Sequence, residues 1–265
     1  MTGLKVAASN IGWAEADDGR VLERMVELGF TGLEIAPTRV FANRPYSKVR
    51  EFAAWAGEIE ARYGLSVCSM QSIWRGRAES IFDDAGASAL IDYTAEACNF
   101  AAAGGVKNLV FGCPSNRSVP QGHDGLEAGA FLRACGRLAA DSGAVFALEA
   151  NPPMYDVNFL NTTTEVVDYL DMLEGAPGLG LNLDVGAMIC ADEGMGIVER
   201  AMPYVSHVHI SEPGLAPIVE RSLHRDLRGV LEEGGYCGYV SLEMGRADLG
   251  TVSRCLEYLA ETFLG

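Results

Sequence analysis

The fold is decided by residues 144–184, AVFALEANPPMYDVNFLNTTTEVVDYLDMLEGAPGLGLNLD. The runs 144–149 and 179–184 are apolar, have the length of buried strands, and end in the carboxylates of Glu149 and Asp184. Between them, residues 164–173 carry apolar side chains at helical spacing. Two such strands joined by a helix are typical of a parallel β–α–β unit.

The same pattern recurs along the whole chain. Apolar runs with the length of strands occupy residues 4–9, 32–36, 65–71, 106–111, 144–149, 179–184, 204–210 and 239–243. Segments with helical spacing follow them at residues 19–28, 49–63, 88–103, 126–141, 164–173, 193–202, 218–233 and 251–263. Eight units in strict alternation predict a single (β/α)₈ TIM barrel that spans residues 1–265. An open doubly wound sheet is the rival architecture, but the first loop, SNIGWAEADD, lacks the G-x-G-x-x-G pattern that such a sheet carries there.

The composition excludes several classes of function. The net charge of −16 would repel the phosphate backbone of a nucleic acid. No apolar run approaches the ~20 residues that span a membrane, and the N-terminus shows no secretory signal. The seven cysteines are dispersed without a C-x-x-C pair, which is typical of a reducing compartment. We therefore expect a cytoplasmic protein with a small, neutral or weakly charged substrate, and no nucleic-acid or membrane partner.

Four polar residues end the last four predicted strands: Glu149, Asp184, His209 and Glu243. The carboxyl ends of parallel barrel strands meet at one mouth, where functional groups gather. Three carboxylates buried there without a partner would be costly and would raise one another's pKa, whereas a divalent cation would balance their charge. Three carboxylates and one imidazole suit Mn²⁺ first, with Mg²⁺, Co²⁺, Fe²⁺ or Zn²⁺ as alternatives. We predict one divalent metal ion bound by these four side chains, with open positions for two substrate oxygens.

A second histidine belongs to the same strand. His207 lies two residues before His209, so both side chains point to the same side of the strand. His207 lies one layer deeper, and we expect it to support the site by hydrogen bonding rather than to bind the metal.

The strings around these residues resemble the motifs of a known superfamily. HVHISEP, which starts at His207, resembles H-x-H-[IL]-x-[DE], and GGYCGYVSLEM, which contains Glu243, resembles GY-x-G-x-[VI]-S-x-E. LEANP and LNLDVG stand where this superfamily places its ligands on the fifth and sixth strands. Over nearly its whole length the chain thus resembles the xylose isomerase-like TIM barrels, which include sugar isomerases, epimerases and endonuclease IV.

The resemblance implies a metal-dependent isomerase or epimerase of a sugar or a related polyhydroxy carbonyl compound. In members similar to ketose 3-epimerases, two glutamate ligands also form the acid–base pair, and here they would be Glu149 and Glu243. One would remove a proton next to the carbonyl to give a metal-bound enediolate, and the other would return a proton. Two alternatives use the same site: a dehydratase similar to inosose or dehydroshikimate dehydratases, and an enzyme that cleaves C-glycosides of oxidised sugars. A non-catalytic sugar-binding barrel is a third, although it has no use for two opposed acid–base groups.

The sequence departs from the superfamily at Ala187. The sixth-strand motif commonly reads D-x-x-H, and its histidine binds substrate or a second metal; here the string is Asp184-Val185-Gly186-Ala187. The missing imidazole removes a ligand that a multinuclear site would need. With four histidines in total and a charge of −16, we do not expect a trinuclear zinc enzyme that nicks DNA.

Six further residues at strand ends or in the following segments are predicted to contact substrate: Glu34, Gln71, Arg117, Asn151, Tyr155 and His224. Arg117 could pair with a substrate carboxylate or phosphate. No second basic residue stands convincingly beside it, so the sequence does not predict a sugar phosphate. Barrels of this kind often form dimers or tetramers, so a homo-oligomer is compatible with the sequence.

Overall fold

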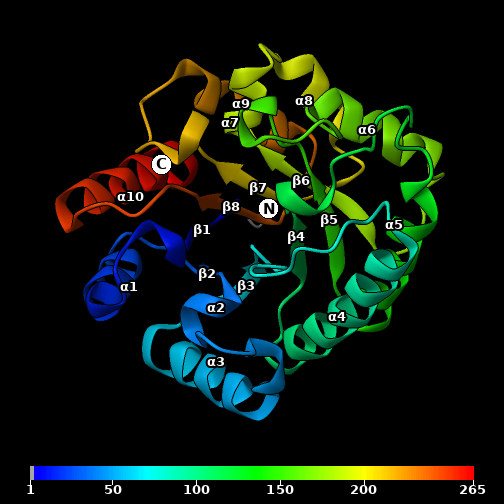
Figure 1. Ribbon diagram of the computed structural model, residues 1–265. Coiled ribbons are helices and arrows are strands. Elements are labelled where there is room, and N and C mark those ends of the chain that lie inside the picture. The colour runs from blue at the N-terminus through cyan, green and yellow to red at the C-terminus, as the bar shows by residue number, and fades with distance from the viewer. Residues whose placement is uncertain (1–2) are drawn as a thin grey trace.

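The computed structural model describes residues 3–265, whose strands close into one parallel barrel surrounded by helices (Figure 1). The strands pair in the order of the sequence, and β1 pairs with β8 to close the sheet. They are β1 (Lys5–Ser9), β2 (Gly32–Ile35), β3 (Ser66–Met70), β4 (Asn108–Phe111), β5 (Val145–Glu149), β6 (Leu179–Asp184), β7 (Val205–Ile210) and β8 (Tyr239–Leu242). The predicted (β/α)₈ barrel is confirmed.

Helices cover the outside of the barrel as a ring (Figure 1). They are α1 (Asp18–Glu27), α2 (Pro37–Val40), α3 (Val49–Tyr63), α4 (Asp84–Ala103), α5 (Ala128–Asp141), α6 (Thr163–Met172), α7 (Val185–Cys190), α8 (Met195–Ala201), α9 (Ser222–Glu233) and α10 (Leu249–Leu264). Within the described residues, none of these helices is long and apolar enough to cross a membrane.

Several helices begin where the sequence did not predict it, and at α4 and α7 the reason is a carboxylate cap. Helix α4 starts four residues earlier than expected, since the Asp83 carboxylate accepts a hydrogen bond of 2.7 Å from Gly86 N. Helix α7 was not predicted at all. It follows β6 directly because Asp184 accepts a hydrogen bond of 2.6 Å from Ala187 N.

Apolar packing holds the helices against each other and against the sheet. The rings of Phe52 in α3 and Phe100 in α4 stack with centroids 3.9 Å apart. Gly104, just past α4, makes room for this pair, because a Cβ there would lie 2.3 Å from the Phe52 ring. Each fully buried aromatic side chain of this kind stabilises the fold by about 2 kcal/mol.

The interior of the barrel is polar at several positions. Glu34, Asn182, His209 and Ser241 are fully buried there, and His207 is 1% exposed. Buried polar side chains usually find partners inside the protein. Glu34, Asn182, His207 and His209 contact one another or the carboxylates of the site described next, whereas the Ser241 hydroxyl has no hydrogen-bond partner among the described residues.

Candidate metal centre

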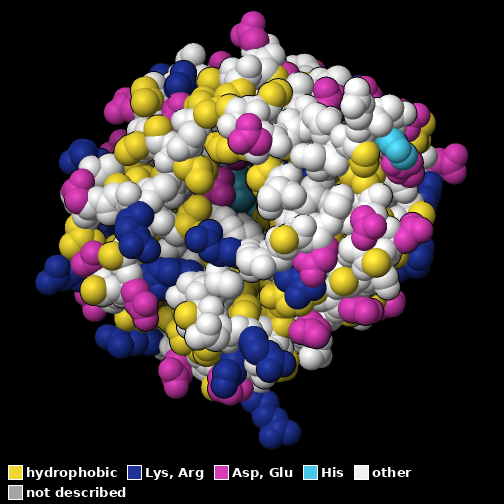
Figure 2. Space-filling view, in the orientation of Figure 1, with side chains coloured by type: hydrophobic (Ala, Val, Ile, Leu, Met, Phe, Trp, Pro, Cys, Tyr) yellow, Lys and Arg dark blue, Asp and Glu magenta, His cyan; other side chains and the backbone are white. Residues whose placement is uncertain are grey.

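The four predicted metal ligands come together at the carboxyl ends of β5 to β8. Each offers one ligand atom, and these atoms all lie within 4.8 Å of one another. Lateral strand register contributes to this arrangement, since Asp184 in β6 pairs with His209 in β7. Figure 2 shows the molecule hollowed at the centre of this view, with acidic and histidine side chains deep in the hollow.

His209 is the centre of the cluster. Its Nδ1 lies 3.2 Å from Glu149 Oε1, 3.2 Å from Glu243 Oε2 and 3.9 Å from Asp184 Oδ2. The imidazole is fully buried, and each of the two glutamates is 8% exposed. Nδ1 is therefore the nitrogen that faces the three carboxylates.

The crowding of buried negative charge shifts the pKa values of the cluster. Burial, together with the charges of Glu149 and Glu243, raises the pKa of Asp184 to about 7. Burial likewise raises the pKa of Glu243. Although burial opposes it, the charges of Glu243 and Glu34 raise the pKa of His209 well above its usual value. A bound divalent cation would balance the negative charge of these buried carboxylates in place of protons.

The donor set fits a divalent cation. Two ligand atoms bound to one ion at about 2.1 Å each lie about 3–4 Å apart, which agrees with the observed spacing within 4.8 Å. Three carboxylates and one imidazole are a mixture of hard and borderline donors, which several first-row divalent ions accept. That these four residues bind a metal stays a prediction.

Side-chain amides hold the two glutamates. Gln71 Nε2 donates to Glu243 Oε1 at 2.7 Å, and Asn151 Nδ2 donates to Glu149 Oε2 at 3.1 Å. Asn182 Nδ2 donates to the other Glu149 oxygen, Oε1, at 2.8 Å. Each glutamate thus turns one oxygen to His209 and the other to the amide of Gln71 or Asn151.

Asp184 is fixed differently. Its Oδ2 accepts a hydrogen bond of 2.6 Å from Ser211 Oγ, and Ser211 Oγ in turn accepts one of 2.8 Å from Gly186 N. Gly186 must lack a side chain here, since a Cβ would lie 2.8 Å from Ser211 Oγ. Ala187, where the superfamily commonly has histidine, is buried and does not line the cavity.

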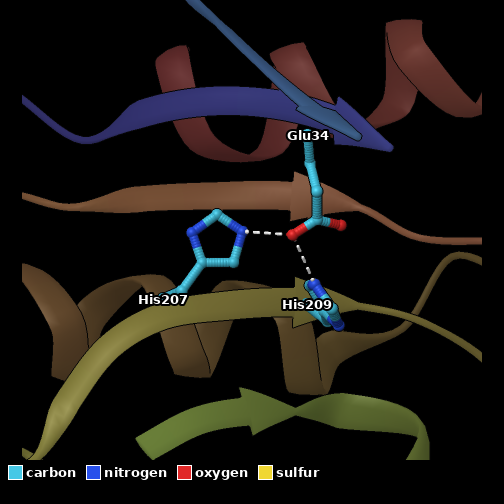
Figure 3. Close-up of side chains that lie close together, drawn as sticks. All are labelled: Glu34, His207 and His209. Atoms are coloured by element: carbon cyan, nitrogen blue, oxygen red, sulfur yellow. Dashed lines mark hydrogen bonds and ion pairs between the residues drawn. The ribbon is translucent and has the colours of Figure 1, made fainter. Parts of the chain in front are cut away.

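A fourth carboxylate, that of Glu34, lies on the other side of His209 (Figure 3). Glu34 Oε2 lies 2.9 Å from His209 Nε2 and 3.1 Å from His207 Nε2. Although burial opposes it, the neighbouring His209 and His207 hold the pKa of Glu34 well below its usual value. These contacts are of hydrogen-bond length, and the three side chains also offer ligand atoms that lie within 4.8 Å of one another. Glu34 thus bridges the two histidines, and that His207 supports the site by hydrogen bonding rather than by binding the metal stays a prediction.

A cavity of about 370 Å³ opens above the cluster. Of the six residues predicted to contact substrate, Gln71, Asn151 and Tyr155 line it, together with Glu149, Asp184 and Glu243. Asn182, Ser211 and the cavity-lining Arg75 were not predicted from the sequence as site residues. Asn182 had a signal, since it is a polar residue within the apolar run LNLD.

The other three predicted contacts do not line this cavity. Glu34 lies below it, against the histidines. Arg117 is fully buried, and its guanidinium donates to the carbonyl oxygens of Phe111 and Leu160 at 3.4 Å each. His224 is buried in α9 with Nδ1 2.9 Å from Tyr258 Oη. Arg117 thus connects the end of β4 to the loop that contains Leu160, and His224 belongs to the packing between α9 and α10.

Comparisons with known proteins agree with this architecture. The sequence matches the family described as "Xylose isomerase-like TIM barrel" over residues 22–261. A search of curated protein sequences gave no match.

Solved structures with the same fold share little sequence with the chain. The 3-keto-D-glucoside 4-epimerase of E. coli is 20% identical, with a TM-score of 0.75 over 99% of this chain and 100% of its own. The D-psicose 3-epimerase of Clostridium cellulolyticum is 18% identical, with a TM-score of 0.77 over 98% of each chain. An AP endonuclease family 2 protein from Brucella melitensis is 17% identical, with a TM-score of 0.75 over 97% of this chain and 99% of its own. The family match covers most of the sequence, and the chain belongs to the xylose isomerase-like TIM barrel family.

Proposed function

We propose that this protein is a divalent-metal-dependent isomerase or epimerase of a sugar or a related polyhydroxy carbonyl compound. One observation carries the proposal: Glu149 and Glu243 are arranged alike at the cavity. Glu149 turns Oε1 to His209 and Oε2 to the amide of Asn151, whereas Glu243 turns Oε2 to His209 and Oε1 to the amide of Gln71. Two opposed carboxylates that each keep an oxygen outside the metal cluster are what an acid–base pair requires.

The residues of the metal centre have separate tasks. Glu149, Asp184, His209 and Glu243 would hold the ion, which when bound would polarise a substrate carbonyl and stabilise the negative charge of an enediolate. One glutamate, through its oxygen outside the cluster, removes the proton from the carbon next to the carbonyl. The other glutamate, protonated on its corresponding oxygen, returns a proton. The amides of Asn151 and Gln71 keep these oxygens in place.

The structural relatives support a carbohydrate substrate. They include a 3-keto-D-glucoside 4-epimerase and a D-psicose 3-epimerase crystallised with D-tagatose. Both names describe inversion of one carbon of a sugar, which is the outcome that two opposed carboxylates favour.

The first test is metal content, measured by elemental analysis of wild type and of the Asp184→Ala/His209→Ala double variant. We expect about one divalent ion per wild-type chain, Mn²⁺ first, and loss of that ion in the variant. A wild-type protein that contains no metal and takes up no added Mn²⁺ would overturn the proposal.

In the second test, ketoses are incubated with the Mn²⁺-loaded protein in D₂O. NMR of the sugars then measures the exchange of their carbon-bound hydrogen for deuterium. Exchange with epimer formation supports the proposal, whereas exchange with loss of water would identify a lyase instead. A metal-loaded protein that binds ketoses without exchange would be a binding protein.

A further inference from the structure

The loop after β3 carries positive charge to the mouth of the barrel. Arg75, Gly76 and Arg77 line the cavity above the carboxylates, and they also line an adjoining depression of about 400 Å³. Arg44, from the loop between α2 and α3, lines the same depression. Arg44, Arg75 and Arg77 are called the basic rim below. Figure 2 shows Lys and Arg side chains close to the edge of the central hollow.

Buried contacts fix the backbone of this loop on both sides of Arg75. Before it, Tyr46 Oη donates to Ile73 O at 2.6 Å, and the buried Trp74 donates from Nε1 to Thr94 Oγ1 at 3.0 Å. After it, Asn116 Nδ2 donates to Arg77 O at 3.1 Å. The loop therefore presents Arg75 at a defined place on the rim.

Two of the three arginines have no acidic partner. Arg77 pairs with Glu79 and lies over the ring of Tyr93, with 4.7 Å from Cζ to the centroid. Within residues 3–265, the side chains of Arg44 and Arg75 form no hydrogen bond or ion pair with another residue. Among the other described arginines, some pair with carboxylates, such as Arg24, Arg39 and Arg221, and some exposed ones, such as Arg50 and Arg137, do not. Arg44 and Arg75 differ from these exposed arginines in that they line a depression at the mouth of the barrel.

We propose that the basic rim binds an anionic group of the substrate, a phosphate ester or a carboxylate, with Arg75 and Arg44 as the principal contacts. This inference rests on the proposed function, because it places the reacting carbons of the same molecule at Glu149 and Glu243. A neutral sugar would leave both guanidinium groups without an ionic partner, whereas an anionic oxygen group accepts paired hydrogen bonds from arginine.

The charges of the site also fix the orientation of such a substrate. An anionic group next to Glu149, Asp184 and Glu243 would be repelled, so the anion belongs at the rim and the carbonyl end in the depth of the cavity. In a chain with a net charge of −16, positive charge at this opening would also help an anionic substrate to approach. A neutral or weakly charged substrate was expected from the sequence, and the basic rim changes this expectation to an anionic substrate.

The test compares three ligands by isothermal titration of the Mn²⁺-loaded protein: D-fructose, D-fructose 6-phosphate and D-fructuronate. The variants are Arg75→Gln, Arg44→Gln and, as the matched control, Arg137→Gln, which removes the same charge from an exposed position of α5. We expect wild type to bind at least one anionic sugar about tenfold more tightly than D-fructose, and less so at high salt. Arg75→Gln should lower the ratio of the two affinities, anionic sugar over D-fructose, about tenfold. Arg137→Gln should leave this ratio unchanged. The stronger of the two anionic ligands tells whether the rim selects a phosphate ester or a carboxylate.

Equal binding of neutral and anionic sugars, no detectable binding of either anionic sugar, or equal effects of Arg75→Gln and Arg137→Gln would each overturn the inference. Exchange with D₂O, measured on the same samples, keeps it separate from the proposed function. Tighter binding of an anionic sugar without hydrogen exchange would refute the acid–base function of the glutamates, but it would support anion binding by the basic rim. Hydrogen exchange without tighter binding of an anionic sugar would refute anion binding by the basic rim, but it would support the proposed isomerase or epimerase function.

Discussion

Replacement of Gly112 by alanine should disable Glu149 while leaving the protein folded. Gly112 follows β4, and a Cβ at this position would lie 2.5 Å from Glu149 Oε2. An ordinary contact needs about 3.5 Å, so the oxygen would have to move by about 1 Å. Oε2 is the oxygen that lies outside the metal cluster in the proposed mechanism. A misplacement of about 1 Å at a reacting group costs about 100-fold in rate, and we expect a loss of this size.

The assay is the rate of hydrogen exchange with D₂O for a ketose that the wild type accepts, together with urea unfolding. The obstructed atom is the end of a flexible side chain, so the free energy of unfolding should change by less than about 1 kcal/mol. Gly57→Ala is the control, because Gly57 lies in α3 with no atom within 4 Å of an added Cβ. This variant should keep the wild-type exchange rate. An exchange rate of Gly112→Ala within threefold of wild type would refute the role of Glu149 Oε2.

Three further substitutions address other parts of the structure. Glu34→Gln should weaken Mn²⁺ binding about 10- to 100-fold in a calorimetric titration, because an amide does not replace the carboxylate that orients His209; an unchanged Kd would contradict this role. Glu243→Gln should lower the exchange rate by about 100- to 10,000-fold with a wild-type unfolding midpoint, and full activity would remove Glu243 from the acid–base pair. Burial lowers the pKa of His224 to about 4 in the folded protein, whereas a histidine of the unfolded chain has a pKa of about 6.5. Between these pH values the unfolded chain binds more protons than the folded one, so the stability of the wild type falls as the pH decreases through this window. His224→Gln should therefore lose less unfolding free energy than wild type between pH 7 and pH 4.5, and equal losses in urea titrations would show that His224 does not contribute.

The strands were predictable to within about two residues because each is a buried apolar run between turn signals. Helix starts were less predictable, since they depend on hydrogen bonds that spacing does not reveal. Asp83 begins α4 and Asp184 begins α7 by accepting from backbone N–H groups. At Asp184 the sequence suggested a metal ligand, and the structure shows a helix cap at the same carboxylate that also faces the cluster.

The candidate site was predictable where strand order alone determines it. Glu149, Asp184 and His209 lie on consecutive strands with their ends at the same mouth, and Glu243 directly follows the next strand, so their proximity follows from the barrel. The basic rim was not predictable in this way. Arg44 and Arg75 belong to different loops, and they line one depression only because those loops fold against each other.

The partners of the two His209 nitrogens could not be predicted from the sequence, because they come from other strands of the barrel. Glu34 is 175 residues away in the chain, yet β2 and β7 are brought together across the interior of the closed barrel, and Glu34 Oε2 accepts from His209 Nε2 at 2.9 Å. On the other side, Asn182 Nδ2 lies 3.1 Å from His209 Nδ1 and donates to Glu149 Oε1. A carboxylate can only accept, so Glu149 fixes which end of the Asn182 amide faces the cluster, and that end is a donor aimed at Nδ1. The raised pKa of His209 favours protons on both nitrogens. A cation bound at the carboxylates would take the place of the proton on Nδ1, while Glu34 would keep the proton on Nε2, so that the lone pair of Nδ1 would face the cation.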